Sequence, residues 1–134
     1  MIAIDTNVLV RLLIVDDSAQ CDLARSLVEG QRVLILRTVL LETEWVLRSR
    51  FGLERHLIHQ FFEGLAETSG IEIEAETATR RAINAYAKGI DFADALHATA
   101  STLPFHTFDE KLLRQRRRVA EADIVGVPKR RVAR

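Results

Sequence analysis

The sequence predicts an α/β protein in which a central, mostly parallel β-sheet is flanked by α-helices. Short apolar runs, which suit buried strands, alternate along the chain with longer segments whose apolar residues recur every three or four positions. Strands that alternate with helices are joined by right-handed crossovers, which make neighbouring strands parallel. No internal repeat or convincing linker is present, so we expect a single domain over residues 1–134, with a basic, flexible tail after about residue 127.

Each expected element follows from its own pattern of apolar and turn residues. The strands are expected at Ile2–Ile4, Val33–Leu36, Ile71–Ile73, Phe105–Phe108 and Ile124–Val125. The helices are expected at about 8–13, 18–29, 38–50, 54–65, 78–88, 91–101 and from 109 onward. Glycines at positions 30, 52 and 89 act as stop signals for three of these helices.

Composition excludes several classes of protein. The 134 residues are 48% hydrophobic and 28% charged, which is typical of a globular domain with a core. No apolar run reaches the roughly 20 residues of a membrane helix, and the first residues lack a basic leader, so we expect a cytoplasmic protein without membrane contact. The single cysteine, Cys21, makes neither an internal disulfide nor a zinc cluster, and we expect it in the core.

Charge is balanced overall but uneven along the chain. The formal net charge of zero argues against a protein that holds nucleic acid only by a broad basic face. The last quarter of the chain is nevertheless rich in arginine and lysine. This segment is explained equally well by a solvated helix face and by contact with phosphates or an acidic partner.

Two aspartates directly follow expected strands. Asp5 comes after the first strand, and Asp109 comes after the strand at 105–108. Ligands of open parallel sheets bind beyond the carboxyl ends of the strands, so we expect both side chains on the same rim of the sheet. Either aspartate alone is explained at least as well as an N-cap of the next helix. The pair favours a functional site, because two close carboxylates repel each other unless a cation or proton lies between them.

The helix at 38–50 carries two glutamates with different expected roles. The helix is apolar almost all round, so we expect it to be central and mostly buried, with Trp45 in the core. Glu44 precedes Arg48 by one turn, a pairing that stabilises an exposed helix face. Glu42 has no basic partner one turn away. Since an unpartnered carboxylate on such a helix is costly unless it binds something, we interpret Glu42 as the functional acid.

Asp91 and Asp94 lie three positions apart at the start of an expected helix, so they project from one side of it. Asp91 suits the N-cap, Asp94 suits the third helical position, and both favour the positive end of the helix dipole. Spacing alone therefore leaves a structural role and a functional role open for this pair.

The acidic residues, taken together, indicate which kind of reaction the protein could catalyse. Acids at two strand ends and on two helices could converge on one pocket, and ligand sets made only of oxygen suit Mg²⁺ or Mn²⁺ rather than zinc. Such ions activate water and stabilise the charge that builds on a phosphate during an in-line displacement. The sequence contains no glycine-rich phosphate-binding loop and no serine in a nucleophile elbow.

Four segments resemble the signature segments of PIN domains, and most closely those of VapC-type toxins from bacterial type II toxin–antitoxin pairs. They are Ile4–Leu9, Leu40–Arg48, Asp91–Ala98 and Thr107–Asp109. They occur in the family's order and at its spacing, and they cover nearly the whole chain. The resemblance implies a PIN-like fold, with a parallel sheet between helices and acids gathered in a groove.

The resemblance also assigns residues. It implies that Mg²⁺ or Mn²⁺ is bound, and catalysis performed, by Asp5, Glu42, Asp94 and Asp109. Asp91 matches a frequent additional acid of the family and is a further candidate metal ligand. Asn7 and Thr107 match polar neighbours that orient the carboxylates.

The resemblance implies an endoribonuclease that hydrolyses RNA phosphodiester bonds in a tRNA or rRNA loop. It further implies a homodimer and a partner antitoxin protein that blocks the groove. Two alternatives remain at this stage. One is a PIN-like interaction module without catalysis. The other, a metal-dependent phosphatase with Asp5 as nucleophile, is weaker, because such enzymes generally need a second aspartate two positions on, where this chain has Asn7.

Overall fold

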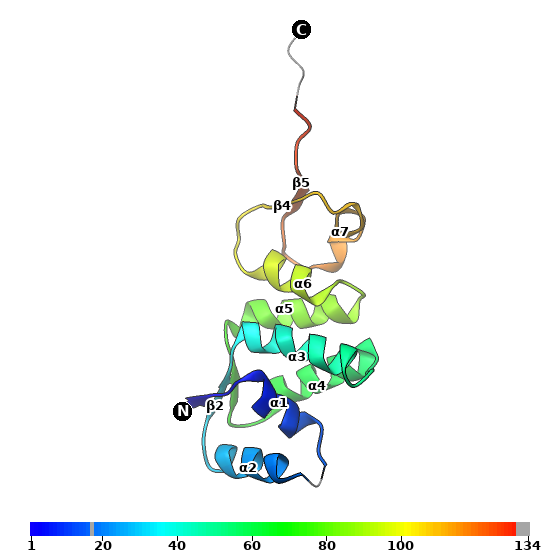
Figure 1. Cartoon of the computed structure of the whole chain (residues 1–134). Helices are drawn as coiled ribbons and strands as arrows, with labels where there is room; N and C mark the ends of the chain where they lie inside the picture. The colour runs from blue at the N-terminus through cyan, green and yellow to red at the C-terminus, as the bar shows by residue number, and fades with distance from the viewer. Residues whose placement is uncertain (17, 131–134) are drawn as a thin grey trace.

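The chain folds into seven α-helices, one 3₁₀ helix and five strands within residues 1–16 and 18–130, which are the residues that the computed structural model describes (Figure 1). The strands are β1 (Ile2–Ala3), β2 (Val33–Ile35), β3 (Ile71–Ile73), β4 (Phe105–Thr107) and β5 (Ile124–Gly126). The helices are α1 (Thr6–Leu13), α2 (Ala19–Val28), α3 (Arg37–Ser49), α4 (Arg55–Glu67), α5 (Glu76–Ala87), α6 (Phe92–Thr99), α7 (Glu110–Arg114) and the 3₁₀ helix η1 (Arg116–Arg118). The expected order of elements is confirmed.

All the strand pairs are parallel, as the alternation of strands and helices predicts. β1, β2 and β3 form one sheet in that order, with Ile2 opposite Val33 and Val33 opposite Ile71. β4 and β5 form a second, two-stranded sheet, with Phe105 opposite Ile124. The sheet therefore lies in two parts within the described residues, and no backbone pairing joins β1 to β4.

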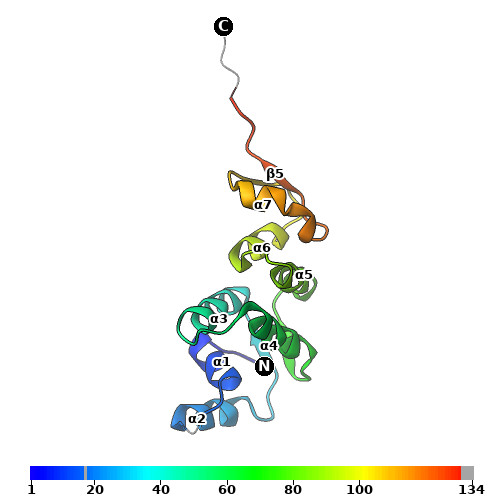
Figure 2. The same ribbon diagram turned by 90° about the vertical axis from the view of Figure 1, so that its right-hand side faces the viewer.

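The elements are arranged along the molecule in nearly the order of the chain. Figures 1 and 2, which differ by a quarter turn, both place α1 and α2 toward one end, α5 and α6 in the middle, and α7 with β5 toward the other end. α5 packs most extensively against α6, and α1 packs against both α2 and α3. This arrangement separates the residues that follow β1 from those that follow β4.

The core is apolar and contains a compact aromatic group. Phe62, Tyr86 and Phe92 are almost completely buried, and the Phe92 ring centre lies 5.3 Å from that of Phe62 and 5.2 Å from that of Tyr86. Such tilted pairs are favourable beyond the area that they bury. Because Phe92 is the first residue of α6, this packing fixes the position of the α6 N-terminus.

Local signals explain where α2 lies. Ser18 caps the helix, since its hydroxyl accepts a hydrogen bond from the Cys21 backbone N–H at 3.2 Å. Cys21 is fully buried, as expected.

No helix of the described residues is both long and apolar enough to cross a membrane. The expected tail after residue 127 lies partly outside the described residues.

Candidate active site

Three aspartates line one pocket at the start of α6 and α7. Asp91, Asp94 and Asp109 surround a space of about 270 Å³, together with Lys111. Asp91 and Asp94 come from the first turn of α6, and Asp109 precedes α7 directly after β4. The structure thus brings together three of the five acids that the sequence singles out.

Helix capping sets the orientation of these aspartates. Asp91 Oδ2 accepts a hydrogen bond from the Asp94 backbone N–H at 3.1 Å, and Asp109 Oδ1 accepts one from the Leu112 N–H at 3.0 Å. Each cap uses one carboxylate oxygen, which leaves the second oxygen for another partner. The capping role and a ligand role are therefore compatible at both positions.

The three aspartates disturb one another electrostatically. Partial burial of Asp94, followed by the negative charges of Asp91 and Asp109, raises the pKa of the Asp94 carboxyl above its usual range. A divalent cation would relieve this repulsion, and carboxylate oxygens are the donors that Mg²⁺ and Mn²⁺ prefer. The residues present thus fit such an ion in chemical type and in charge.

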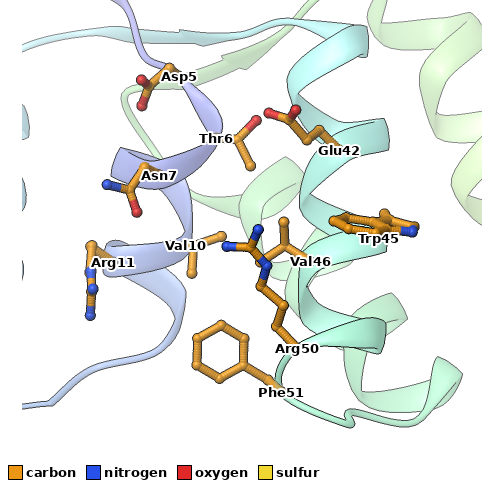
Figure 3. Close-up of a pocket in the computed structure, with 10 residues that line it drawn as sticks. All are labelled: Asp5, Thr6, Asn7, Val10, Arg11, Glu42, Trp45, Val46, Arg50 and Phe51. Atoms are coloured by element: carbon orange, nitrogen blue, oxygen red, sulfur yellow. The ribbon is translucent and has the colours of Figure 1, made fainter.

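A second acidic pocket lies between α1 and α3, where Asp5 and Glu42 line a space of about 520 Å³. Asp5 caps α1, because its Oδ1 accepts a hydrogen bond from the Val8 backbone N–H at 3.0 Å. Figure 3 shows the Asp5 and Glu42 carboxylates at one end of this pocket, with Thr6 between them. Both carboxylates are exposed and can bind a ligand that enters the pocket.

The two acidic pockets share lining residues with a third space. This space of about 440 Å³ lies against Glu42 and Trp45, which also line the α1–α3 pocket, and against Asp91, which also lines the α6–α7 pocket. We call these three neighbouring spaces the acidic groove. Among the described residues, no group of three or more acidic, histidine or cysteine side chains has the close geometry of a metal cage.

The expectation of one shared rim is wrong for this structure. Asp5 and Asp109 follow strands of different sheets and line different pockets. The physical reason is that β1 and β4 do not pair within the described residues, so their carboxyl ends are not held side by side. Convergence of Asp5, Glu42, Asp94 and Asp109 on one ion stays a prediction.

Glu42 and Glu44 differ in their surroundings, but not in the way that the sequence predicts. Glu44 is the buried glutamate, with 4% of its surface exposed. It pairs with Arg48 at 2.8 Å and accepts a hydrogen bond from the Tyr86 hydroxyl at 3.0 Å. Glu42 is exposed, so the argument from the cost of burying it fails. Glu44 is occupied with structural partners, and Glu42 faces the groove.

The expectation that Trp45 lies in the core is wrong. The sequence places it in the core, but 50% of its surface is exposed and it lines two of the neighbouring spaces of the groove. Glu42 and Trp45 are three positions apart on α3, so they share one face of the helix. That face, which looked buried in the sequence, is the wall of the groove.

The two expected orienting residues differ in their contacts. The Thr107 hydroxyl accepts a hydrogen bond from the Asp109 backbone N–H at 3.0 Å, and this bond holds the turn that presents the Asp109 carboxylate. Asn7 is exposed and lines the same pocket as Asp5, but no hydrogen bond joins the two side chains in the described part of the chain. The structure thus offers a positioning contact for Thr107 only.

In a comparison with protein families, residues 2–118 match a model described as PIN domain. The chain belongs to the PIN domain family. The PIN domain is generally a nuclease fold, and its nucleases typically use divalent metals. A comparison with curated proteins gave no match.

The PIN domain groove also contains residues that the sequence analysis did not single out. They are Thr6, Arg11, Arg50 and Phe51. Arg50 is the C-cap of α3, just beyond its last helical residue, so the helical spacing of Glu42 and Trp45 does not indicate its place in the groove. Phe51 follows the helix at a turn, and no periodic signal in the sequence indicates its place.

Proposed function

We propose that this PIN domain is a metal-dependent endoribonuclease that hydrolyses RNA phosphodiester bonds and acts as the toxin of a toxin–antitoxin pair in the cytoplasm. The observation that carries the nuclease proposal is the group Asp91, Asp94 and Asp109 in one pocket of a PIN domain, with mutual repulsion that a cation would relieve. The finer proposal of RNA as substrate is supported by the likeness of the four sequence segments to VapC-type toxins.

Each acid has a proposed role. Asp94 and Asp109, with Asp91 as a further ligand, hold Mg²⁺ or Mn²⁺, and Asp5 and Glu42 complete the site across the groove. The cation would supply positive charge to the scissile phosphate and activate a water molecule. The carboxylates nearest the phosphate would accept a proton from the attacking water.

Positive residues beside the pocket support binding of a polyanion. Lys111 lines the same space as the three aspartates, and the exposed side chains of Arg116 and Arg117 follow it on η1. RNA phosphates would be repelled by the acids themselves, so flanking cations are needed to hold the strand. We assign this contact to Lys111 and to the basic residues that follow it.

The proposed partners are an antitoxin protein and a second copy of the chain. Support comes from the resemblance to VapC-type toxins and from an apolar strip on α2. Leu23 and Leu27 are exposed there and line a shallow space against α1. Co-expression with a neighbouring small gene product, followed by co-purification and light scattering, tests both associations.

Incubation of total cellular RNA with the purified protein and Mg²⁺ or Mn²⁺, followed by sequencing of the new RNA ends, tests the ribonuclease proposal. We expect discrete new ends that disappear with EDTA and with Asp5→Asn or Asp94→Asn. Asp22→Asn is the matched control, because Asp22 is an exposed aspartate in the first turn of α2, away from the groove. Full cleavage activity in Asp5→Asn and Asp94→Asn would refute the assignment.

A PIN-like interaction module is the second candidate. The separation of Asp5 and Glu42 from the other three acids, with no ready-made metal cage in residues 1–16 and 18–130, favours it. A folded protein that neither binds Mn²⁺ nor cleaves RNA would establish this alternative.

A further inference from the structure

The pocket between α1 and α3 has two aromatic side chains that the fold leaves half-exposed. Trp45 keeps 50% and Phe51 keeps 44% of its surface accessible to solvent. Both line the space of about 520 Å³ that carries Asp5 and Glu42 at one end. Large aromatic side chains that stay exposed in a concave site beside polar groups are typical of a binding site for a planar ligand.

Arg50 gives the same pocket a positive charge. Its guanidinium carbon lies 6.0 Å from the centre of the Trp45 ring. Figure 3 shows the guanidinium directed into the pocket, near Val46 and Val10, with the Phe51 ring beneath it. The ion pairs of the described residues do not include Arg50, so its charge is available to a ligand.

An aromatic wall, a free guanidinium and two carboxylates match the parts of a nucleotide. A nucleobase stacks on an aromatic ring, whichever base it is, because every base has a π-face. A guanidinium binds phosphate through parallel hydrogen bonds, and exposed carboxylates accept hydrogen bonds from base amino groups.

We propose that the α1–α3 pocket holds one unstacked nucleobase of single-stranded RNA against Trp45 and Phe51, with the adjoining phosphate on Arg50. The proposal rests on the proposed ribonuclease function and names the substrate class: RNA whose base beside the cleavage site is unpaired. Bases in a duplex remain stacked on their neighbours and cannot enter, so the pocket selects loops and single strands.

Trp45 gives this proposal a direct signal, because it is the only tryptophan in the chain. The probes are a single-stranded RNA oligonucleotide, the same sequence in a duplex, and an abasic ribose-phosphate oligomer, each added to the full-length Asp94→Asn protein to prevent cleavage. We expect the single strand to quench Trp45 fluorescence and the other two probes to leave it nearly unchanged.

Variants of the pocket residues test whether a loss of RNA binding comes from lost stacking or from lost folding. Trp45→Ala should weaken single-strand binding about 5- to 100-fold and raise KM for cleavage, with kcat nearly unchanged. Trp45→Phe should restore most of the affinity, and Arg50→Ala should reduce the dependence of affinity on salt. Leu103→Ala, which removes an exposed apolar side chain between α6 and β4, is the control and should behave like the parent protein.

The outcomes for the pocket and for the ribonuclease differ. Cleavage with unchanged Trp45 fluorescence and a normal KM for Trp45→Ala would overturn the nucleobase pocket alone. Quenching by single-stranded RNA without cleavage by the unmutated protein would support the pocket and overturn the ribonuclease. Neither quenching nor cleavage would overturn both, and would leave a protein segment as the occupant.

Discussion

At the scale of single residues, the surroundings of two glutamates on α3 give them different roles. Glu44 is buried between the half-exposed Arg48 and the Tyr86 hydroxyl. Burial of Tyr86, followed by the nearby Glu44 charge, raises the pKa of the Tyr86 hydroxyl. Glu42, two positions earlier, faces the groove. Positions two apart in a helix point in different directions, so the two carboxylates should respond independently to substitution.

The first prediction compares the same substitution at both positions. Glu44→Gln should lower the free energy of unfolding by about 1–2 kcal/mol, because it removes the buried charge that pairs with the half-exposed Arg48 and accepts a hydrogen bond from the buried Tyr86 hydroxyl. Glu42→Gln should change it by less than about 0.5 kcal/mol but strongly reduce RNA cleavage. Urea denaturation and cleavage rates, measured on both variants, check this pattern. The reverse pattern would mean that Glu44 is the functional acid.

The second prediction concerns Asp94, whose pKa is raised by burial and by Asp91 and Asp109. A carboxyl with a raised pKa in the folded state destabilises that state once it is ionised, and the penalty disappears as the pH falls below the unfolded value of about 4. Asp94→Asn should therefore raise the melting temperature of the metal-free protein by a few degrees at pH 7.5, with little difference at pH 4.

Binding of a metal ion should act in the opposite direction on these melting temperatures. Addition of Mg²⁺ or Mn²⁺ should raise the melting temperature of the unmutated protein more than that of Asp94→Asn, because only the former keeps the full set of ligands. Differential scanning fluorimetry with and without the ion measures both effects. A metal-free variant that melts below the parent at pH 7.5 would contradict the electrostatic argument.

At the scale of elements, two arginines form hydrogen bonds that hold the turn between α5 and α6, which leads into the pocket that contains Asp91. Arg55, the first residue of α4, donates hydrogen bonds to the Tyr86 and Ile90 carbonyl oxygens at 2.7 and 2.8 Å. Its guanidinium carbon also lies 4.4 Å from the centre of the Tyr86 ring. Arg118 donates to the Lys88 carbonyl oxygen at 3.1 Å. These contacts place the end of α5, and hence Asp91 just beyond it.

The third prediction follows from that turn. Arg55→Ala should destabilise the fold by about 1–3 kcal/mol, since it leaves the Ile90 carbonyl without its donor, removes one of the donors to the Tyr86 carbonyl and removes a cation–π contact. It should also weaken Mn²⁺ binding, because Asp91 loses its support. Arg116→Ala, at an exposed site on η1, is the control and should leave stability unchanged. Chemical denaturation and calorimetric titration with Mn²⁺ make the comparison, and equal stability of the two variants would contradict it.

The elements show which features a sequence can predict. The strands and the helices depend on neighbouring residues and are predicted correctly, and the N-cap reading of Asp5, Asp91 and Asp109 is confirmed for the same reason. The burial of Glu44 depends on Tyr86, which is 42 positions away, so the helix pattern alone gave the wrong exposure. The division of the sheet depends likewise on whether β1 meets β4, a contact that no local pattern specifies.

At the scale of the whole molecule, the acidic groove spans both parts of the chain. Asp5 and Glu42 belong to the part built on β1 to β3, whereas Asp91, Asp94 and Asp109 surround the start of α6 and α7. Within the second group, electrostatic influence is direct, since both other aspartates raise the pKa of Asp94. Asp5 and Glu42 are not among the groups that shift the pKa of Asp94, so we expect two separate acidic centres in the metal-free protein.

The fourth prediction tests this separation with double-mutant cycles on Mn²⁺ affinity. Asp94→Asn and Asp109→Asn should couple by more than about 0.5 kcal/mol, because both side chains would contact the same ion. Asp94→Asn and Asp5→Asn should be additive within about 0.3–0.5 kcal/mol in the absence of RNA. Isothermal titration of the single and double variants gives both couplings. Equal coupling in the two pairs would show that the groove closes around one ion in the free protein.

The buried thiol of Cys21 makes the opening of the N-terminal helices measurable. Its sulfur donates to the Ile14 carbonyl oxygen at 3.5 Å and to Asp16 Oδ1 at 3.1 Å, and no part of the residue is exposed. A thiol reagent can therefore reach it only through a local opening where α1 and α2 meet, and the labelling rate gives the frequency of that opening. Since α1 also carries one wall of the groove, the same rate shows how often that wall moves.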